Sequence, residues 1–295
     1  SGKTYVITGA SAGAGLEATR VFLSKGANVV MMNRNADKST AAIANLKQEF
    51  GSDGDVTFVP MDLAVLDSVR EAAAEVLENV PRIDALVCNA AIAQVARQEI
   101  TVDGFESQLG VNHFGHFLLC GLLFEPIEES AGRIVIVGSN AYKMGLKRIQ
   151  FENLNFDKNY TAWNAYDQSK LAQMKFAYEL QRRVEAAGKS VTVLVCHPGA
   201  SRTNLLKDTA STFNKIVWSI LSRIIAQSAE KGSWPEVMCA TEKEVESEKL
   251  YGPTKRSEMV GPIDECPLDE CALDRDEAAR LWTNSEQKTS RSWSP

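Results

Sequence analysis

Long apolar runs are missing from this sequence, and no stretch approaches the roughly 18 residues needed to cross a bilayer. The first β-rich run begins at residue 4, which leaves no room for a secretory signal peptide before it. Positive charge is also in deficit, with 32 Lys and Arg against 38 Asp and Glu and an isoelectric point near 5.3. That balance argues against nucleic acid or an anionic membrane as the main partner. We expect a cytoplasmic protein with no transmembrane segment and a small-molecule partner.

Cysteine and histidine are scarce, with six and three residues. Four cysteines lie in apolar stretches, where a thiol behaves as a small buried hydrophobe: Cys88, Cys120, Cys196 and Cys239. Cys266 and Cys271 are too isolated in the sequence to suggest a metal site, and without secretion a disulfide is not expected. His113 and His116 share a helix face but lack a third ligand, which favours packing roles. The sequence therefore predicts no metal.

Short apolar runs rich in β-branched residues alternate with segments of helical period. The runs are TYVITGA at 4–10, NVVMMNR at 28–34, VTFVPMD at 56–62, IDALVCNAA at 83–91, RIVIVGS at 133–139 and SVTVLVCHPG at 190–199. Nearly all are apolar on both faces, as a sheet covered on both sides requires. The pattern predicts an α/β fold, a Rossmann-type doubly wound parallel sheet with helices on both faces.

The segment TGASAGAG at residues 8–15 follows the first expected strand and opens a helix. Gly9, Gly13 and Gly15 would give the tight turn and close backbone approach that a pyrophosphate needs at a helix N-terminus. We predict that these glycines and Ser11 bind a dinucleotide cofactor, the alternative being a plain tight turn. The spacing differs from the common G-x-G-x-x-G, which indicates a particular subclass of dinucleotide binder.

The end of the second expected strand carries Asn33 and Arg34 where an NAD enzyme usually has an acid for the ribose hydroxyls. Arg34, with Lys38 one helical turn later, would attract a 2′-phosphate through charge-assisted hydrogen bonds. This predicts NADP(H), the alternative being a solvated surface arginine. Asp62, followed by Leu63, is placed to meet the adenine, although it could equally cap a helix.

The segment NAYDQSKLAQ at residues 164–173 places Tyr166 and Lys170 four residues apart, on one face of an expected helix. The phenol and the ammonium could therefore share one pocket. The spacing alone proves little, because a half-buried aromatic beside a solvated lysine would look the same.

Further motifs follow in a fixed order: CNAA at 88–91, VNHFGHF at 111–117, RIVIVGS ending at Ser139, AYDQSK at 165–170 and HPGASRT at 197–203. Together with the glycine motif they resemble the short-chain dehydrogenase/reductase family over roughly residues 4–205. The segment LNFDKNYTAWNAYDQSKLAQ and the long interval from Ser139 to Tyr166 look most like its retinol-dehydrogenase-like branch. The stretch from CNAA to NHFGHFLL is also similar to light-dependent protochlorophyllide reductase.

The resemblance implies roles for four side chains. Tyr166 would be the acid/base, and Lys170 would lower the tyrosine pKa and hold the ribose. Ser139 would hydrogen-bond the substrate oxygen, and Asn112 would order a water beside the lysine. A free tyrosine has a pKa of about 10, and a nearby ammonium with an oxidised nicotinamide would favour the phenolate. The resemblance also implies cofactor contacts near the ribose (Asn89, Ala90 and Ala91) and the nicotinamide (Pro198, Gly199 and Thr203).

Three departures from the family pattern stand out. CNAA replaces the commoner NNAG but keeps Asn89. VGS replaces VSS, so Ser139 must act alone. The interval between Ser139 and Tyr166 carries an inserted segment, so their pairing depends on the fold. None of these changes removes a reacting group.

The segment FNKIVWSILSRIIAQ at residues 213–227 has the i, i+3, i+4 apolar recurrence of an amphipathic helix. We expect an apolar substrate lid at about residues 205–232, within an NADP-binding domain of residues 1–250; core packing is the alternative. After residue 250 the pattern fades into irregular chain, then one helix within 274–287. Residues 251–295 are expected to form a C-terminal extension that packs on the same domain.

An NADP(H)-dependent oxidoreductase that interconverts a hydrophobic carbonyl compound and its alcohol is the expected function. One alternative is a protochlorophyllide-reductase-like enzyme acting on a ring double bond, although the longer loop that such enzymes carry before the tyrosine is missing here. Another is a non-catalytic NADP-sensing or scaffold protein. Family members are often dimers or tetramers, so a homo-oligomer is a further expectation unless the C-terminal tail caps the usual interface.

Overall fold

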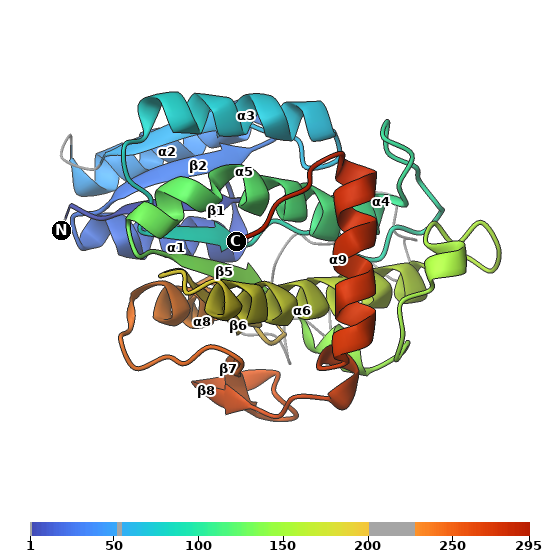
Figure 1. Ribbon diagram of the computed structural model, residues 1–295. Coiled ribbons are helices and arrows are strands. Elements are labelled where there is room, and N and C mark those ends of the chain that lie inside the picture. Colours follow the sequence, from blue (N-terminus) through green and yellow to red (C-terminus); the bar gives the residue numbers. More distant parts are fainter. Residues whose placement is uncertain (1, 52–54, 201–227) are drawn as a thin grey trace.

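One mixed β-sheet runs through the centre of the molecule (Figure 1). The structure is a computed structural model and describes residues 2–51, 55–200 and 228–295. Within them the strand order is β3-β2-β1-β4-β5-β6-β7-β8, and only β7 and β8 pair antiparallel. The strands are β1 Thr4–Thr8, β2 Asn28–Asn33, β3 Val56–Pro60, β4 Ala85–Cys88, β5 Arg133–Val137, β6 Thr192–Cys196, β7 Leu250–Lys255 and β8 Val260–Cys266. The predicted doubly wound α/β sheet is confirmed.

Helices cover both faces of the sheet (Figure 1). One face carries α3 Leu66–Asn79, α5 Gly115–Glu129 and α6 Ala162–Ala186. The other carries α1 Gly13–Ser24, α2 Ala36–Phe50 and α8 Ala229–Thr241. The short α4 Ser107–Leu109 runs through a π-helix, Gly110–Phe114, into α5. Strand residues alternate between the two cores, with Val6 facing α3, α5 and α6, and with Tyr5 and Ile7 facing the opposite layer.

The C-terminal hairpin is the main difference from the sequence expectation. Irregular chain was expected after residue 250, but β7 extends the sheet beside β6, with Leu250 paired to Val195, and β8 pairs with β7. Each strand contains a proline, Pro253 or Pro262, which lowers β propensity and hides the pattern. An outer hairpin tolerates these prolines, because β8 is an edge strand and the β7–β8 register shifts after Pro253.

The last helix, α9 Arg275–Thr289, forms where the sequence predicts it. Asp274 caps its start by accepting a hydrogen bond from the Glu277 N–H, and the first turn is acidic. Figure 1 shows α9 crossing α6, and Trp282 packs edge-on against Phe117 of α5 with the ring centroids 5.2 Å apart. The C-terminal segment therefore shares the core of one domain.

No helix among the described residues has the length and apolar character that would let it cross a bilayer. The expected apolar lid falls largely outside the described residues, since only its last five residues, 228–232, are described, as the N-cap and first residues of α8. Thr203 and the amphipathic stretch 213–227 also lie outside them. The four cysteines expected to be buried, Cys88, Cys120, Cys196 and Cys239, are buried free thiols.

Candidate active site

The predicted site residues gather at the carboxyl ends of the parallel strands. The strand order reverses direction between β1 and β4, which is where a doubly wound sheet opens a crevice for a ligand. Residues 9–13, called here the glycine turn, follow β1, and Asn89 follows β4. Ser139 follows β5, and residues 197–200, called the proline turn, follow β6.

The glycine turn requires its glycines. Gly9 and Gly13 have φ of 71° and 62°, the left-handed region that side chains disfavour. A Cβ on Gly15 would lie 2.5 Å from Asn89 Nδ2 and 2.8 Å from the Gly9 carbonyl oxygen. Close packing of helix, turn and β4 therefore excludes any side chain at this position.

Neutral hydrogen bonds hold the glycine turn. Asn89 Nδ2 donates to the carbonyls of Thr8 and Gly9 at 2.9 and 3.2 Å. The Ala10 N–H donates to Asn33 Oδ1 at 2.6 Å. Asn33 is buried and its Nδ2 also donates to Ser39 Oγ, so this amide links the glycine turn to α2. Sequence reasoning placed Asn33 near the ribose but missed this bracing role.

The start of α1 suits a phosphate. Its N-cap residue, Ala12, offers no side-chain cap, and the first turn carries no acid. The first N–H groups of a helix lack intrahelical partners and sit at the positive end of the helix dipole. A pyrophosphate cradled by the glycine turn would accept hydrogen bonds from these groups, so the residues present fit a dinucleotide.

The side chains predicted to select the cofactor lie at the surface beside this turn. Arg34 is two-thirds exposed, and its Nη1 is 4.0 Å from Asp62 Oδ2. Lys38 is exposed on the first turn of α2. Asp62 Oδ1 accepts a hydrogen bond from the Ala64 N–H at 2.9 Å, and Leu63 is buried against Gly115. The structure thus leaves the guanidinium at the crevice edge in a long, solvent-screened ion pair.

Tyr166, Lys170 and Ser139 converge although 26 residues separate the serine from the tyrosine. Both α6 side chains are buried, and Lys170 Nζ lies 5.8 Å from the centre of the Tyr166 ring. The Ser139 hydroxyl hydrogen-bonds the Tyr166 phenol. The inserted segment between them therefore does not prevent their pairing.

Burial opposes the charged forms of both titratable groups. It raises the pKa of Tyr166 above its ordinary value, and the hydrogen bond from Ser139 lowers that pKa in part. Burial lowers the pKa of Lys170 to about 7. The sequence argument expected the ammonium to favour the phenolate, but here desolvation is the largest effect on the tyrosine.

Gln173 is a site residue that sequence reasoning missed. Lys170 Nζ donates to Gln173 Oε1 at 2.7 Å and to the Val137 carbonyl at 3.2 Å. The amide supports the charged lysine without adding a counter-charge. Its place three residues after Lys170 on the same helix face was the available signal.

Asn112 lies in the π-helix, a rare geometry that often marks functional sites. Its Oδ1 accepts from the Ile92 N–H at 2.9 Å, and its Nδ2 donates to the Ile92 carbonyl at 3.0 Å. The same Nδ2 also donates to Ser169 Oγ at 2.9 Å. Asn112 therefore ties the chain after β4 to the helix that carries Tyr166 and Lys170. Its predicted role in ordering a water remains a prediction.

The two histidines near Asn112 are packing residues, as expected. His116 Nδ1 bonds the Asn112 carbonyl at 3.0 Å, and its Nε2 bonds Thr8 Oγ1 at 2.9 Å. His113 Nε2 bonds Ser285 Oγ at 2.8 Å. Burial lowers the pKa of His113 to about 3 and that of His116 to about 4, so both are neutral near pH 7.

The inserted segment is anchored by a second residue that sequence reasoning missed. Asp167, next to Tyr166, is buried and accepts hydrogen bonds from the N–H groups of Gly145 and Leu146. Burial raises the pKa of Asp167 to about 6, partly offset by these bonds and by the nearby Lys147. The loop between Ser139 and Tyr166 is thus fixed to α6, the helix that carries Tyr166 and Lys170.

The proline turn contacts the C-terminal hairpin. Gly199 has φ of 65°, and a Cβ on it would lie 2.5 Å from the Met259 carbonyl oxygen. The Ala200 N–H donates to that same oxygen at 2.9 Å, and the Gly199 N–H donates to His197 Nδ1 at 3.2 Å. The hairpin tip, residues 256–259, therefore supports the turn expected to border the nicotinamide.

Cys266 is not isolated in space. The hairpin brings it together with His197 and Glu258, and one ligand atom from each lies within 4.8 Å of the others. Lys143 Nζ donates to both Glu258 oxygens at 2.9 Å, which places a positive charge where a cation would sit. His197 Nδ1 faces an N–H donor, whereas a histidine bound to metal through Nε2 would have to donate from Nδ1. This donor set fits a metal poorly.

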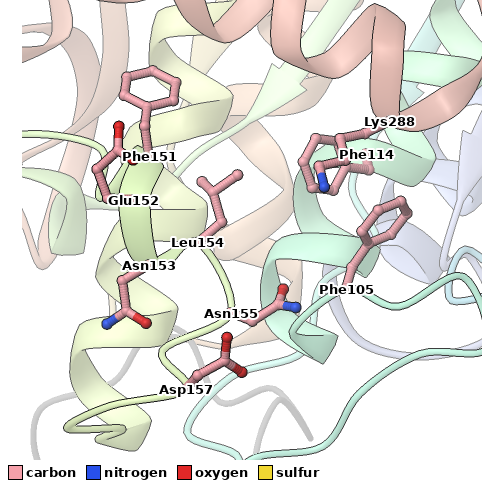
Figure 2. A pocket seen from close by; sticks show the side chains of 9 residues that line it. All are labelled: Phe105, Phe114, Phe151, Glu152, Asn153, Leu154, Asn155, Asp157 and Lys288. Atoms are coloured by element: carbon pink, nitrogen blue, oxygen red, sulfur yellow. The ribbon is translucent and has the colours of Figure 1, made fainter.

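A separate cavity of about 190 Å³ lies beside the inserted segment (Figure 2). Phe105 and Phe114 lie on one side of it and Leu154 and Asn155 on the other, and Lys288 of α9 also lines it. None of the four predicted catalytic residues lines it. We do not assign the substrate to this cavity.

A doubly wound sheet with a glycine turn at its switch point and a Tyr and Lys on one helix is typical of dinucleotide-dependent oxidoreductases. The comparison with known families is more specific, because the family model for short chain dehydrogenase matches residues 3–151. The chain belongs to the short-chain dehydrogenase/reductase family.

Known relatives refine this assignment. The chain is 36% identical to retinol dehydrogenase 14 of Mus musculus, over 97% of this chain and 85% of that protein. It is 35% identical to retinol dehydrogenase 13 of Homo sapiens, over 96% and 83%. A solved structure of an uncharacterized protein from Mycobacterium paratuberculosis superposes with a TM-score of 0.81 at 35% identity, covering 99% of this chain and 95% of that one.

These matches confirm the predicted family and its retinol-dehydrogenase-like branch. Members of the family are oxidoreductases that use a nicotinamide cofactor. The protein is accordingly an oxidoreductase that transfers hydride between a nicotinamide and a CH–OH or C=O group of a small molecule.

Proposed function

We propose that the protein is an NADP(H)-dependent reductase that interconverts a hydrophobic carbonyl compound and its alcohol, with Tyr166 as acid/base. The observation that carries this proposal is the convergence of the Ser139 hydroxyl, the Tyr166 phenol and the Lys170 ammonium beside the glycine turn. A carbonyl oxygen placed between the two hydroxyls would receive one hydrogen bond from each.

The proposed reduction needs one hydride and one proton. NADPH, held at the glycine turn, would supply the hydride to the carbonyl carbon and would thereby be oxidised to NADP⁺. Tyr166 donates its proton to the oxygen as negative charge develops there, and the raised pKa keeps the phenol protonated for this step. Ser139 stabilises the developing alkoxide without competing for the proton. Lys170, held by Gln173, stabilises the phenolate that remains.

The proposed preference for NADP(H) rests on Arg34 and on the lack of an acid at Asn33. The last residue of β2 is Asn33, whose side chain is a neutral amide that bonds within the fold. The end of β2 therefore presents no carboxylate that would repel a 2′-phosphate. Arg34 and Lys38 are exposed beside the crevice and supply positive charge there. A charge-assisted hydrogen bond of this kind contributes about 1.5–3 kcal/mol.

The proposed substrate class follows the relatives. Retinol, which the names of two relatives give as their substrate, is a long apolar alcohol. The apolar recurrence at residues 213–227 would suit the same kind of molecule. The cytoplasmic location and the homo-oligomer remain predictions.

The test is NADPH oxidation with a panel of aldehydes and ketones, run in the dark and in the light. We expect turnover in the dark, with kcat/KM rising as the apolar part of the carbonyl compound lengthens. NADPH binding without any turnover would support the scaffold alternative instead. Turnover that requires light and acts on a ring double bond would support the protochlorophyllide-reductase-like alternative.

A further inference from the structure

The hairpin tip has an unusual backbone. Arg256, Ser257 and Glu258 have consecutive φ values of 51°, 56° and 62°, and none of them is glycine. Each such residue costs of the order of 1 kcal/mol and persists only where its surroundings hold it. The contacts of Glu258 identify what holds this tip.

Glu258 bridges two segments of the active site. Both of its carboxylate oxygens accept from Lys143 Nζ at 2.9 Å, and the pair is largely buried. Its Oε2 also lies 3.6 Å from His197 Nε2, a van der Waals contact too long for a hydrogen bond, and burial lowers the pKa of His197 to about 4, so the ring is neutral near pH 7. Lys143 ends the 3₁₀ helix Asn140–Lys143, and the Ser139 hydroxyl caps the start of that helix by accepting the Ala141 N–H at 3.2 Å. The carboxylate thus joins the segment behind Ser139 to the end of β6.

His197 connects Glu258 with the backbone of the proline turn. Its Nδ1 accepts the Gly199 N–H, so in the neutral ring Nε2 carries the proton and points toward Glu258. The ring is buried and packs against Gly252 of β7, where any Cβ would collide with it. The Ala200 N–H also donates to the Met259 carbonyl. The proline turn therefore contacts the hairpin tip at two neighbouring residues, Glu258 and Met259.

We propose that Glu258 is a positioning residue: paired with Lys143 and packed against His197, it fixes the hairpin tip, and with it the proline turn, relative to Ser139. The inference rests on the proposed function, in which the proline turn borders the nicotinamide and Ser139 holds the substrate oxygen. Hydride transfer requires donor and acceptor carbons to be aligned, and small misplacements slow it strongly. The contacts of Glu258 are to Lys143 and His197 rather than to the residues proposed to bind substrate and cofactor, so we expect its removal to act on alignment rather than on binding.

The experiment compares Glu258→Gln, Lys143→Met and their double variant with Lys147→Met. Lys147 is the matched control, because it lies on the same loop and pairs with Asp269 at 2.7 Å; it contacts Lys143 only at the main-chain carbonyl and not at the Lys143–Glu258 pair. We expect kcat to fall about tenfold in Glu258→Gln and Lys143→Met, with no further loss beyond about twofold in the double variant. The isotope effect with deuterated NADPH should rise, while NADPH affinity and the control enzyme stay within about twofold.

Three results would overturn the proposal: unchanged kcat in both single variants, additive losses in the double variant, or losses that follow thermal stability alone in all four proteins. Amide hydrogen exchange provides a readout that does not depend on turnover. Glu258→Gln should speed exchange at Gly199 and Ala200 and leave Ala10 in the glycine turn unchanged. Inactive wild-type protein would contradict the proposed function, whereas unchanged exchange at Gly199 would contradict the role of Glu258.

Discussion

The glycine turn and the proline turn lie at the same edge of the sheet but are held by different chemistry. Neutral amides of Asn33 and Asn89 brace the glycine turn, and both come from strands adjacent to β1. An ion pair and a buried imidazole brace the proline turn, and the carboxylate comes from a hairpin nearly sixty residues later in the chain.

This difference matches the part of the cofactor that each turn is expected to contact. A pyrophosphate would be repelled by a carboxylate beside the glycine turn, so neutral amides brace the backbone and leave its N–H groups positive. The proline turn is expected to border the nicotinamide, where a shielded carboxylate paired with a lysine brings no such penalty. The neutral hydrogen bonds of the glycine turn are insensitive to salt, whereas the Lys143–Glu258 ion pair is weakened by it. That ion pair also forms only when the hairpin is docked on the sheet.

Within this comparison of the two turns, the largest effect should come from Gly15→Ala, which disturbs the packing of Asn89 against the glycine turn. The new Cβ would lie 2.5 Å from Asn89 Nδ2, so Asn89 or the turn must move. We expect NADPH affinity to fall at least about tenfold, and stability to fall by about 1–3 kcal/mol from overpacking. Fluorescence titration and urea unfolding measure the two effects.

Gly188→Ala is the control for this substitution, because a Cβ at Gly188 meets nothing within 4 Å. It also has a positive φ, so a modest loss of stability is expected, with cofactor affinity unchanged. Equal loss of NADPH affinity in both variants would contradict the packing argument.

A smaller effect should follow from reversing the charge beside the glycine turn with Arg34→Asp. We expect the wild type to bind NADPH at least about tenfold more tightly than NADH, and the variant to lose or reverse that preference. Binding of both cofactors by fluorescence decides the question. Equal affinities in the wild type would show that Arg34 is an ordinary surface arginine.

A third brace, Asp167, extends the comparison to pH. The pKa of this carboxyl is raised from 3.8 to about 6, so between about pH 4 and pH 6 the folded state binds more protons than the unfolded state. Stability is therefore lost as pH rises through that window. Asp167→Asn keeps an oxygen for the Gly145 and Leu146 N–H groups and should be more stable than wild type by about 2 kcal/mol at pH 8, but not at pH 4. Urea unfolding at both pH values measures this, and an identical pH dependence in the two proteins would contradict it.

The sequence predicted what short, local patterns encode. Six strands, the glycine turn and the spacing of Tyr166 and Lys170 all follow from periodicity and motif within a few dozen residues. The hairpin was missed because Pro253 and Pro262 lower the β signal of strands that form only by pairing with β6. For the same reason the contact of Glu258 with His197 had no sequence signal, because it exists only after the hairpin has docked.

The sequence also could not predict that the pKa of Tyr166 is raised rather than lowered. The spacing of Tyr166 and Lys170 indicates that the two can approach each other but not how deeply both are buried. In the structure, desolvation outweighs the other effects on the phenol, and it also lowers the pKa of Lys170. Burial depends on the whole fold, including the inserted segment fixed by Asp167.

The most direct test of the central claim is the turnover of Tyr166→Phe on the best carbonyl substrate, measured together with its NADPH affinity. Removing one hydroxyl at similar volume should change stability and NADPH affinity little, while loss of the proton donor should lower kcat by about a hundredfold or more. Full activity in Tyr166→Phe would contradict the account, because it would leave the phenol as a buried aromatic with no part in the chemistry.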